Sequence, residues 1–465
     1  MLTIVFGISM IVLDSTVVNV AFPTLRREFD VGLDEAQWII SIYVLALGIA
    51  TPLAGVLADR FKLKRVYILG LCIFLLGSLV SGLAPNFWLL VGARALQGIG
   101  GGIALPLSTV MLFTTFEDEE QGRAFGIYGV VMVAAPAVGP ILGGLLADAN
   151  LWRWIFFINI PIGSIGIGLA IRFLRATEPK RSIKFNPISF ITIIIGYGCV
   201  LYAASIVNHY GWLSVPVLGF LAVAVVALSV FAVYDLKYAR DPLLELSLYK
   251  NPTFLKANLV GYVAVIALFG AEFLMPVYLQ SLRGRTAMQT GFILLPIAAT
   301  TGVINLIVGG IYDKIGPRLL VITGAGILLI NTWQFTSLSS STPISQIILL
   351  LALRGLAISL IMQPTYTTAL GIVPKENVPR GSSLVNSTRF VVQALGVAVL
   401  ATILGRDLSG FARAYWFTFY AALVALVLGA LLPGYPFEWA GRGAIKAWVT
   451  ASRSYLSQRF GRRRA

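Results

Sequence analysis

Charged residues, histidine and cysteine are all scarce in this sequence. Asp, Glu, Lys and Arg make up 12% of its 465 residues, whereas 58% are hydrophobic, and the mean hydropathy is +0.86. A chain with so few charges cannot hide its apolar residues in one water-soluble core, so it needs lipid. With one histidine and two cysteines, Cys72 and Cys199, the sequence predicts no metal site and no structural disulfide.

The sequence also lacks a phosphate-binding loop. No Gly-x-x-x-x-Gly-Lys-Ser/Thr motif occurs, so the chain is not expected to hydrolyse ATP. The glycines between Gly98 and Gly102 lie inside an apolar run, where they favour close helix packing over nucleotide binding. No loop gathers a nucleophile, a base and an orienting group, so we expect no enzymatic activity and no cofactor.

Long apolar runs are abundant. A helix needs about 20 residues to cross roughly 30 Å of hydrocarbon while satisfying its own backbone hydrogen bonds. This predicts an all-α integral membrane protein with fourteen transmembrane helices. Their expected ranges are 2–23, 36–57, 66–84, 88–113, 122–147, 154–173, 186–207, 213–235, 254–281, 287–312, 318–337, 344–372, 381–404 and 411–433.

The distribution of Lys and Arg predicts the topology. If Met1 is cytoplasmic, the inner loops and tail hold 24 of these residues and the outer loops hold 7. The positive-inside rule therefore places both termini in the cytoplasm, in a plasma membrane or bacterial inner membrane. The net charge of +15 indicates topology rather than nucleic-acid binding. The basic tail 434–465 is expected to form an amphipathic helix on anionic lipid headgroups, with a disordered basic tail as the alternative.

One loop motif occurs twice. Gly55-Val-Leu-Ala-Asp59-Arg60 returns as Gly309-Gly-Ile-Tyr-Asp313-Lys314, and a later cation, Lys64 or Arg318, keeps the same spacing. Each copy lies where an apolar run ends and a short charged loop begins. Such a repeat in a polytopic membrane protein indicates two homologous halves and alternating-access transport.

Six motifs in order resemble the fourteen-helix branch of drug:proton antiporters in the major facilitator superfamily. They are Leu13-Asp14-Ser-Thr-Val-Val-Asn19-Val-Ala-Phe-Pro23, Gln37-Trp38, the loop from Gly55 to Arg65, Arg94-Ala-Leu-Gln97-Gly98-Ile-Gly100, Gly126 with Gly139-Pro140-Ile-Leu-Gly143-Gly144, and Trp152-Arg-Trp-Ile-Phe-Phe-Ile-Asn159-Ile-Pro161. The sequence departs from the family pattern at Lys62, where Gly is usual, at Leu63, where Arg is usual, and at Ala135. The second loop keeps Gly316.

The resemblance implies two six-helix bundles with two helices inserted between them. The expected divisions are an N-terminal bundle 1–173, an inserted pair 174–253, a C-terminal bundle 254–433 and the tail 434–465. It further implies a monomeric antiporter that uses the proton gradient to export small amphipathic or lipophilic molecules.

Charges inside apolar runs are candidate functional groups, because each costs a few kcal/mol at bilayer depth unless it is paired or hydrated. The acids are Asp14 and Glu272, and the cations are Arg94, Arg354 and Arg389. Asp14 and Arg94 are expected at similar depths, given a rise of about 1.5 Å per residue. Desolvation disfavours ionised Asp14 and a nearby guanidinium favours it, so the pair suits reversible protonation. A permanently ionised pair that only fixes helix packing is the alternative.

Glu272 and Arg354 repeat this arrangement loosely. Under the 254-residue shift that relates Gly55 to Gly309, the acid is displaced by four positions and the arginine by six. Glu272 is interpreted as a second proton site or a cavity wall that attracts cations; simple pairing with Arg354 is the alternative.

The loop motif is interpreted as a gate. Its residues are Gly55, Asp59, Arg60, Lys64, Asp313, Lys314, Gly316 and Arg318. Asp59 and Arg60 could form an ionic latch with the acids at 117–120, or these charges could only set topology. Gly126, Gly139, Pro140, Gly143 and Gly144 are expected to allow tight packing and a bend in the helix 122–147.

Polar residues in the apolar runs are candidate substrate contacts or helix-to-helix hydrogen bonds. The set is Asn19, Gln37, Gln97, Tyr278, Gln363, Arg354 and Arg389. A largely apolar cavity with few polar groups fits an amphipathic substrate. An exporter of a lipid or endogenous metabolite is a second interpretation, and a non-transporting membrane scaffold or receptor is a third.

Overall fold

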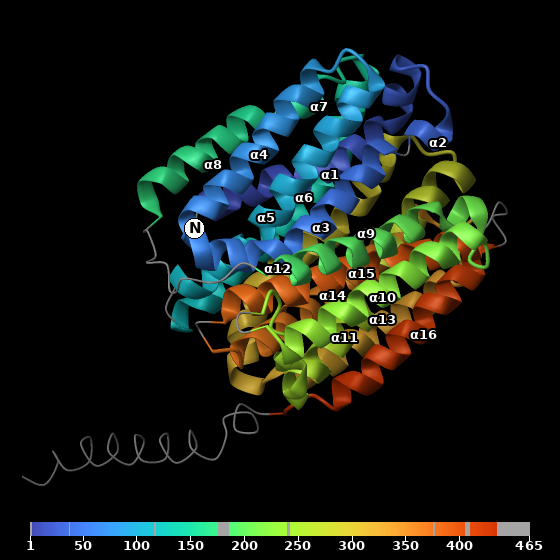
Figure 1. Ribbon diagram of the computed structural model, residues 1–465. Helices are drawn as coiled ribbons and strands as arrows, with labels where there is room; N and C mark the ends of the chain where they lie inside the picture. The colour runs from blue at the N-terminus through green and yellow to red at the C-terminus, as the bar shows by residue number, and fades with distance from the viewer. Residues whose placement is uncertain are drawn as a thin grey trace, which may run out of the picture.

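Each of the fourteen predicted ranges holds a helix in the computed structural model (Figure 1). The structure describes residues 2–36, 38–115, 118–174, 186–239, 242–374, 377–404 and 410–434. The predicted amphipathic tail, apart from Gly434, and Gln37 therefore lie outside the described residues. The helices are α1 Leu2–Glu28, α2 Leu33–Ala36, α3 Trp38–Phe61, α4 Leu63–Leu83, α5 Phe87–Thr115, α6 Asp118–Asp148, α7 Trp154–Phe157, α8 Asn159–Phe173, α9 Pro187–Tyr210, α10 Val215–Lys237, η1 Leu246–Lys250, α11 Pro252–Val277, η2 Tyr278–Leu282, α12 Ala287–Ile315, α13 Pro317–Phe335, α14 Ile344–Gly371, α15 Val378–Leu404 and α16 Gly410–Ala430.

Twelve helices in the described part of the chain are long and apolar enough to span a membrane. The two predicted spans outside this set are α6 and α11, each with several side chains that are not described. Within α11, the apolar stretch Pro252–Leu268 is shorter than a full span. The all-helical membrane fold is thus confirmed, while fourteen complete crossings stay a prediction.

Proline interrupts two of the predicted spans. The range 154–173 is divided into α7 and α8, and Pro161 explains the break because its ring clashes with the carbonyl four residues earlier, at Phe157. Near the end of α11, Pro276 removes another backbone hydrogen bond, and the chain continues as the π-helical turn η2.

Helices pack mainly within two halves. In the first half, α1 contacts α6 and α8, and α5 contacts α3 and α4. In the second half, α14 contacts α12 and α13, and α11 contacts α14, α15 and α16. The inserted helices α9 and α10 pack against each other, and α9 also contacts α3 and α15, one from each half (Figure 1).

The halves meet mainly along two helix pairs, α6 with α12 and α3 with α15, and α5 also contacts α15. Glycine permits close approach in the two main pairs. A Cβ at Gly129 of α6 would lie 2.3 Å from Nδ2 of Asn305 on α12, and a Cβ at Gly55 of α3 would lie 2.9 Å from the carbonyl oxygen of Pro379, in the first turn of α15. Such spacing leaves no room for a side chain, so these contacts require glycine.

The two copies of the loop motif share an unusual backbone. Lys62 precedes α4 with φ 74°, and Gly316 precedes α13 with φ 74°. Glycine adopts this region freely, whereas lysine is strained there. The departure from the family pattern at Lys62 has therefore left the backbone turn in place at an energetic cost.

Candidate functional site

Asp14 lies at the centre of a buried polar network in the first half. Its side chain forms an ion pair with Arg94 of α5, and the carboxylate belongs to a residue only 1% exposed. Asp14 Oδ1 accepts hydrogen bonds from Gln97 Nε2 at 3.2 Å and from Asn159 Nδ2 at 2.8 Å. Ser78 Oγ accepts from the same two amides, at 2.6 and 3.0 Å. Four helices, α1, α4, α5 and α8, thus converge on one carboxylate.

Arg94 is also fully enclosed. Its Nε donates to the carbonyl oxygen of Ile39 at 3.2 Å, and its Nη1 donates to Gln97 Oε1 at 2.8 Å. The guanidinium stacks 4.2 Å from the ring centre of Tyr43. These partners satisfy much of the arginine's donor capacity, which is what makes a buried charge tolerable.

The sequence predicted that Asp14 and Arg94 lie near each other, and the structure brings them together. It places Gln97 in the same network, where it forms the helix-to-helix hydrogen bonds that were one of the two expectations for this residue. Asn159 and Ser78 had been given no role. Both are polar residues inside apolar runs, which was the available signal, but only the fold shows that they face the same carboxylate.

A second buried arginine, Arg354 of α14, anchors the other half. Its Nη2 donates to the backbone carbonyls of Ala267 and Leu268 on α11, and its Nη1 donates to Asn331 Oδ1 at 3.2 Å and Thr332 Oγ1 at 3.5 Å. These described acceptors are all neutral. The side chain of Glu272 lies outside the described part of α11, so its pairing with Arg354 and its proposed roles stay predictions.

Asp59 joins the two halves at the end of α3. Its Oδ2 accepts a hydrogen bond from Nε of Arg380, in the first turn of α15, at 2.9 Å. The two side chains are 13% and 10% exposed, so this pair is much better shielded than a surface ion pair. One turn away, Gly55 N donates to Ser383 Oγ at 3.0 Å. We call these two contacts the inter-half latch.

The latch differs in one partner from the sequence interpretation. Arg380 is one of the 24 Lys and Arg residues assigned to the inner side and had no other expected role, yet it pairs with Asp59. The predicted acidic partners at 117–120 lie outside the described residues or side chains. Arg60 is exposed, with its guanidinium 5.2 Å from the Phe61 ring.

The final cation of each loop copy contacts its own half. Lys64 Nζ donates to the carbonyl oxygens of Ile171 and Leu174 at the end of α8, at 2.6 and 2.8 Å. Arg318 Nε donates to the carbonyl oxygen of Leu432, just past α16. Each cation therefore satisfies carbonyls at the carboxyl end of the last helix of its half. Lys314 is exposed, and the side chain of Asp313 is not described.

The glycines of α6 allow close packing. A Cβ at Gly139 would lie 2.0 Å from Oγ1 of Thr16, so α1 and α6 touch there, whereas Gly144 faces Met288 of α12 at ordinary contact distance. Gly143 is buried. The side-chain surroundings of Gly126 and Pro140 are not described, so the expected bend stays a prediction.

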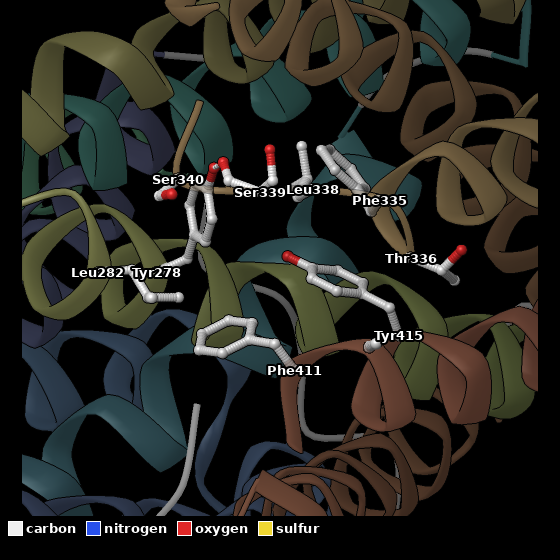
Figure 2. Close-up of a pocket in the computed structure, with 10 residues that line it drawn as sticks. Tyr278, Leu282, Phe335, Thr336, Leu338, Ser339, Ser340, Phe411 and Tyr415 are labelled. Atoms are coloured by element: carbon white, nitrogen blue, oxygen red, sulfur yellow. Dashed lines mark hydrogen bonds between the residues drawn. The ribbon is translucent and has the colours of Figure 1, made fainter. Parts of the chain in front are cut away.

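The other candidate cavity residues are dispersed. Asn19 is exposed, and Gln363 has a buried Oε1 without a hydrogen-bond partner among the described residues. Tyr278 lines a cavity of about 180 Å³ together with Phe335, Phe411 and Tyr415 (Figure 2). Its hydroxyl donates to the carbonyl oxygen of Ser339 at 2.6 Å. This cavity lies within the second half, away from the Asp14 network.

One buried acid went unnoticed in the sequence. Asp235 of α10 accepts hydrogen bonds from Ser189 Oγ at 3.0 Å and from the backbone N–H groups of Leu243 and Leu244 at 3.1 and 3.3 Å. It ties the α9–α10 pair to the segment that follows. Asp235 is the last residue of the predicted span 213–235, so the sequence did not indicate that its side chain is buried.

A two-half helical bundle with a buried acid-arginine network defines a membrane transporter. The family description Major Facilitator Superfamily matches residues 4–397, and the chain belongs to that family. It is similar to the multidrug resistance protein Stp of Mycobacterium tuberculosis, with 30% identity over 87% of this chain and 75% of that protein. It is also similar to the lincomycin resistance protein LmrB of Bacillus subtilis, with 30% identity over 84% and 81%.

A solved structure supports the fold. The human organic anion transporter MFSD10 (TETRAN) superposes with a TM-score of 0.68 at 15% identity, covering 92% of this chain and 98% of that one. The predicted fold class and family are thus confirmed: the protein is a multi-pass membrane transporter with the major facilitator fold. The family consists of transporters rather than enzymes.

Proposed function

We propose that the protein is a proton-coupled secondary transporter that exports amphipathic or hydrophobic compounds by alternating access. The observation that carries this proposal is the burial of Asp14 among Arg94, Gln97, Asn159 and Ser78. A single titratable carboxylate held by four helices can change the packing of all four when it gains a proton. The drug-resistance names of Stp and LmrB support the direction of transport and the substrate class.

The coupling follows from the change in hydrogen bonding that occurs when Asp14 gains a proton. Ionised Asp14 accepts from Arg94, Gln97 and Asn159, whereas a protonated carboxyl becomes a donor at one oxygen and no longer balances the guanidinium. The network must then rearrange, and α1 and α5 move relative to each other. Proton binding and substrate release become linked through one conformational equilibrium.

The inter-half latch is the element on which this equilibrium acts. Asp59 and Arg380 hold α3 against α15, and rocking of the halves must separate them. In this proposal the ends of α3 and α15 that form the inter-half latch face the cytoplasm, and both termini lie on the same side. The protein works as a monomer. The basic tail contacts anionic lipid.

Two other functions remain alternatives. An exporter of a lipid or endogenous metabolite would use the same network, and only its substrate would differ. A membrane scaffold or receptor would need neither the buried acid nor a latch that separates.

Proton flux in proteoliposomes tests the proposal. The purified protein is reconstituted with a pH-sensitive dye inside, and lincomycin or ethidium is added under a pH gradient. We expect substrate-dependent proton movement that disappears in the Asp14→Asn variant. Substrate flux without proton movement would contradict coupling, and absence of flux for a broad amphipathic panel would favour the scaffold interpretation.

A further inference from the structure

Arg389 of α15 is a buried cation that the Asp14 network and the latch do not use. Its Nε and Nη2 are both buried and have no hydrogen-bond partner in the described part of the chain. These two nitrogens form one edge of the guanidinium, with two parallel N–H groups. That edge matches the two oxygens of a carboxylate. An unpaired charge at this depth is costly, so the arrangement calls for an anionic partner.

Aromatic side chains from both halves surround this guanidinium. It lies 5.0 Å from the ring centre of Tyr366 on α14, and Tyr128 on α6, Tyr262 on α11 and Tyr249 on η1 are its electrostatic neighbours. Tyrosine offers an apolar face to a hydrophobic body and a hydroxyl to a polar head. Arg389 thus lies at the junction of the halves, where a transported molecule has to bind.

The surrounding hydroxyl groups do not neutralise Arg389. The hydroxyls of Tyr249 and Tyr262 bond to each other at 2.6 Å, and Tyr366 OH bonds to Ser382 and Asn386. Burial raises the pKa of Tyr249 above its ordinary value, so this side chain is neutral near pH 7.

No described carboxylate reaches Arg389 either. The buried acids among the described side chains are Asp14 and Asp235, and both are bonded elsewhere. The guanidinium lies against Gly261 of α11, where a Cβ would be 2.8 Å from Nη2. Glu272 is eleven residues further along that helix, about 16 Å away along its axis.

We propose that Arg389 binds the anionic group of the substrate, so that the transported compounds include amphipathic carboxylates. The guanidinium edge holds the carboxylate, and the tyrosines contact the apolar body. In this structure Nη2 lies against Gly261, so the edge receives a carboxylate when the halves separate. This inference rests on the proposed function, because it names the part of the substrate that the central site recognises.

Binding to the purified full-length protein in detergent tests the proposal. Naphthalene-1-acetate and naphthalene-1-acetamide share their ring system and differ in charge, and calorimetry at constant salt gives both dissociation constants. We expect the carboxylate to bind about 10- to 100-fold more tightly, as one charge-assisted bidentate contact provides. Equal affinities, or no binding of the carboxylate at millimolar concentration, overturn the proposal.

Substitutions at position 389 test whether Arg389 causes the preference for the carboxylate probe. Arg389→Gln should reduce the difference between the probes to less than about twofold, and Arg389→Lys should keep part of it, since lysine has the charge without the fork. The matched control is Arg413→Gln, an exposed arginine on α16 that should leave the preference unchanged. A full preference in both Arg389 variants overturns the assignment. If Arg389→Gln does not fold, the lysine variant decides, because an unchanged preference there excludes bidentate binding.

The Asp14→Asn variant separates this inference from the proposed function. It should lose proton-coupled export and keep the carboxylate preference, because binding in detergent requires no gradient. Coupled export without any carboxylate preference contradicts the Arg389 site alone. A carboxylate preference without coupling in the unmodified protein contradicts only proton coupling.

Discussion

The two halves bury an arginine in the same way but surround it with different acceptors. Arg94 meets the carboxylate of Asp14, whereas the described acceptors of Arg354 are carbonyl, amide and hydroxyl oxygens. The repeat shift of 254 residues relates Asp14 to Leu268. The carbonyl oxygen of Leu268 is one of the described acceptors of Arg354, although Arg354 itself is displaced by six positions under this shift.

Because of this difference, the acceptors of the two buried arginines respond differently to protons. The described acceptors of Arg354 cannot change charge, so these particular contacts do not respond to pH. A carboxylate changes its charge with one proton, so the same arginine position becomes responsive. We propose that the partner of Arg94 makes the first half a site of coupling, while Glu272 in the second half stays a candidate for a second proton site.

The strongest test of this comparison is Asp14→Asn. We expect uphill export to fall to the rate of protein-free liposomes, while the protein still folds and binds substrate, because asparagine is isosteric and cannot exchange a proton. Export against a gradient in inverted vesicles measures the loss. The matched control is Asp235→Asn, which alters a buried acid outside the network and should leave coupling intact. Normal uphill export by Asp14→Asn would make the carboxylate purely structural.

Removal of each arginine sharpens the comparison. Arg94→Gln leaves a buried carboxylate without its cation, which costs about 3–5 kcal/mol. Arg354→Gln leaves the described neutral acceptors without this donor, and the loss of these contacts costs about 1–3 kcal/mol. Thermal unfolding in detergent should therefore rank Arg94→Gln as the less stable variant. Equal or reversed unfolding temperatures of the two variants would argue against the assigned roles.

The latch provides a smaller, conformational test. Asp59→Asn removes a shielded charge-assisted hydrogen bond worth about 1.5–3 kcal/mol, which corresponds to roughly a tenfold or greater shift toward the state open at this end. Single cysteines placed along the adjoining ends of α5 and α12 report the shift by their labelling rates. The exchange Asp59→Arg with Arg380→Asp should restore much of the closed population. Unchanged labelling in Asp59→Asn would leave these residues with topology alone.

The sequence predicted the helices and the Asp14–Arg94 pair because both depend on local composition. Length and hydropathy determine where a helix spans lipid, and a lone acid such as Asp14 stands out in an apolar run. The sequence could not predict Asn159 as a partner of Asp14, because neutral polar residues recur throughout the apolar runs and only tertiary packing selects among them. Arg380 was missed for a related reason: the pairing of α3 with α15 is a contact between residues 321 positions apart.

The smallest expected effect concerns the two loop turns. Lys62 and Gly316 share a φ of 74° and occupy equivalent places before α4 and α13, but only glycine tolerates this region without strain. Lys62→Gly should relieve about 1–2 kcal/mol of strain, offset in part by about 0.5–1 kcal/mol of extra chain entropy in the unfolded state. We expect a rise of roughly one to two degrees in melting temperature. Lys62→Ala removes the ammonium and keeps the Cβ, so it should not stabilise, and Gly316→Ala should destabilise. Equal stabilisation by Gly and Ala at position 62 would assign the effect to the side-chain charge, and the two halves would then differ in charge rather than in backbone strain.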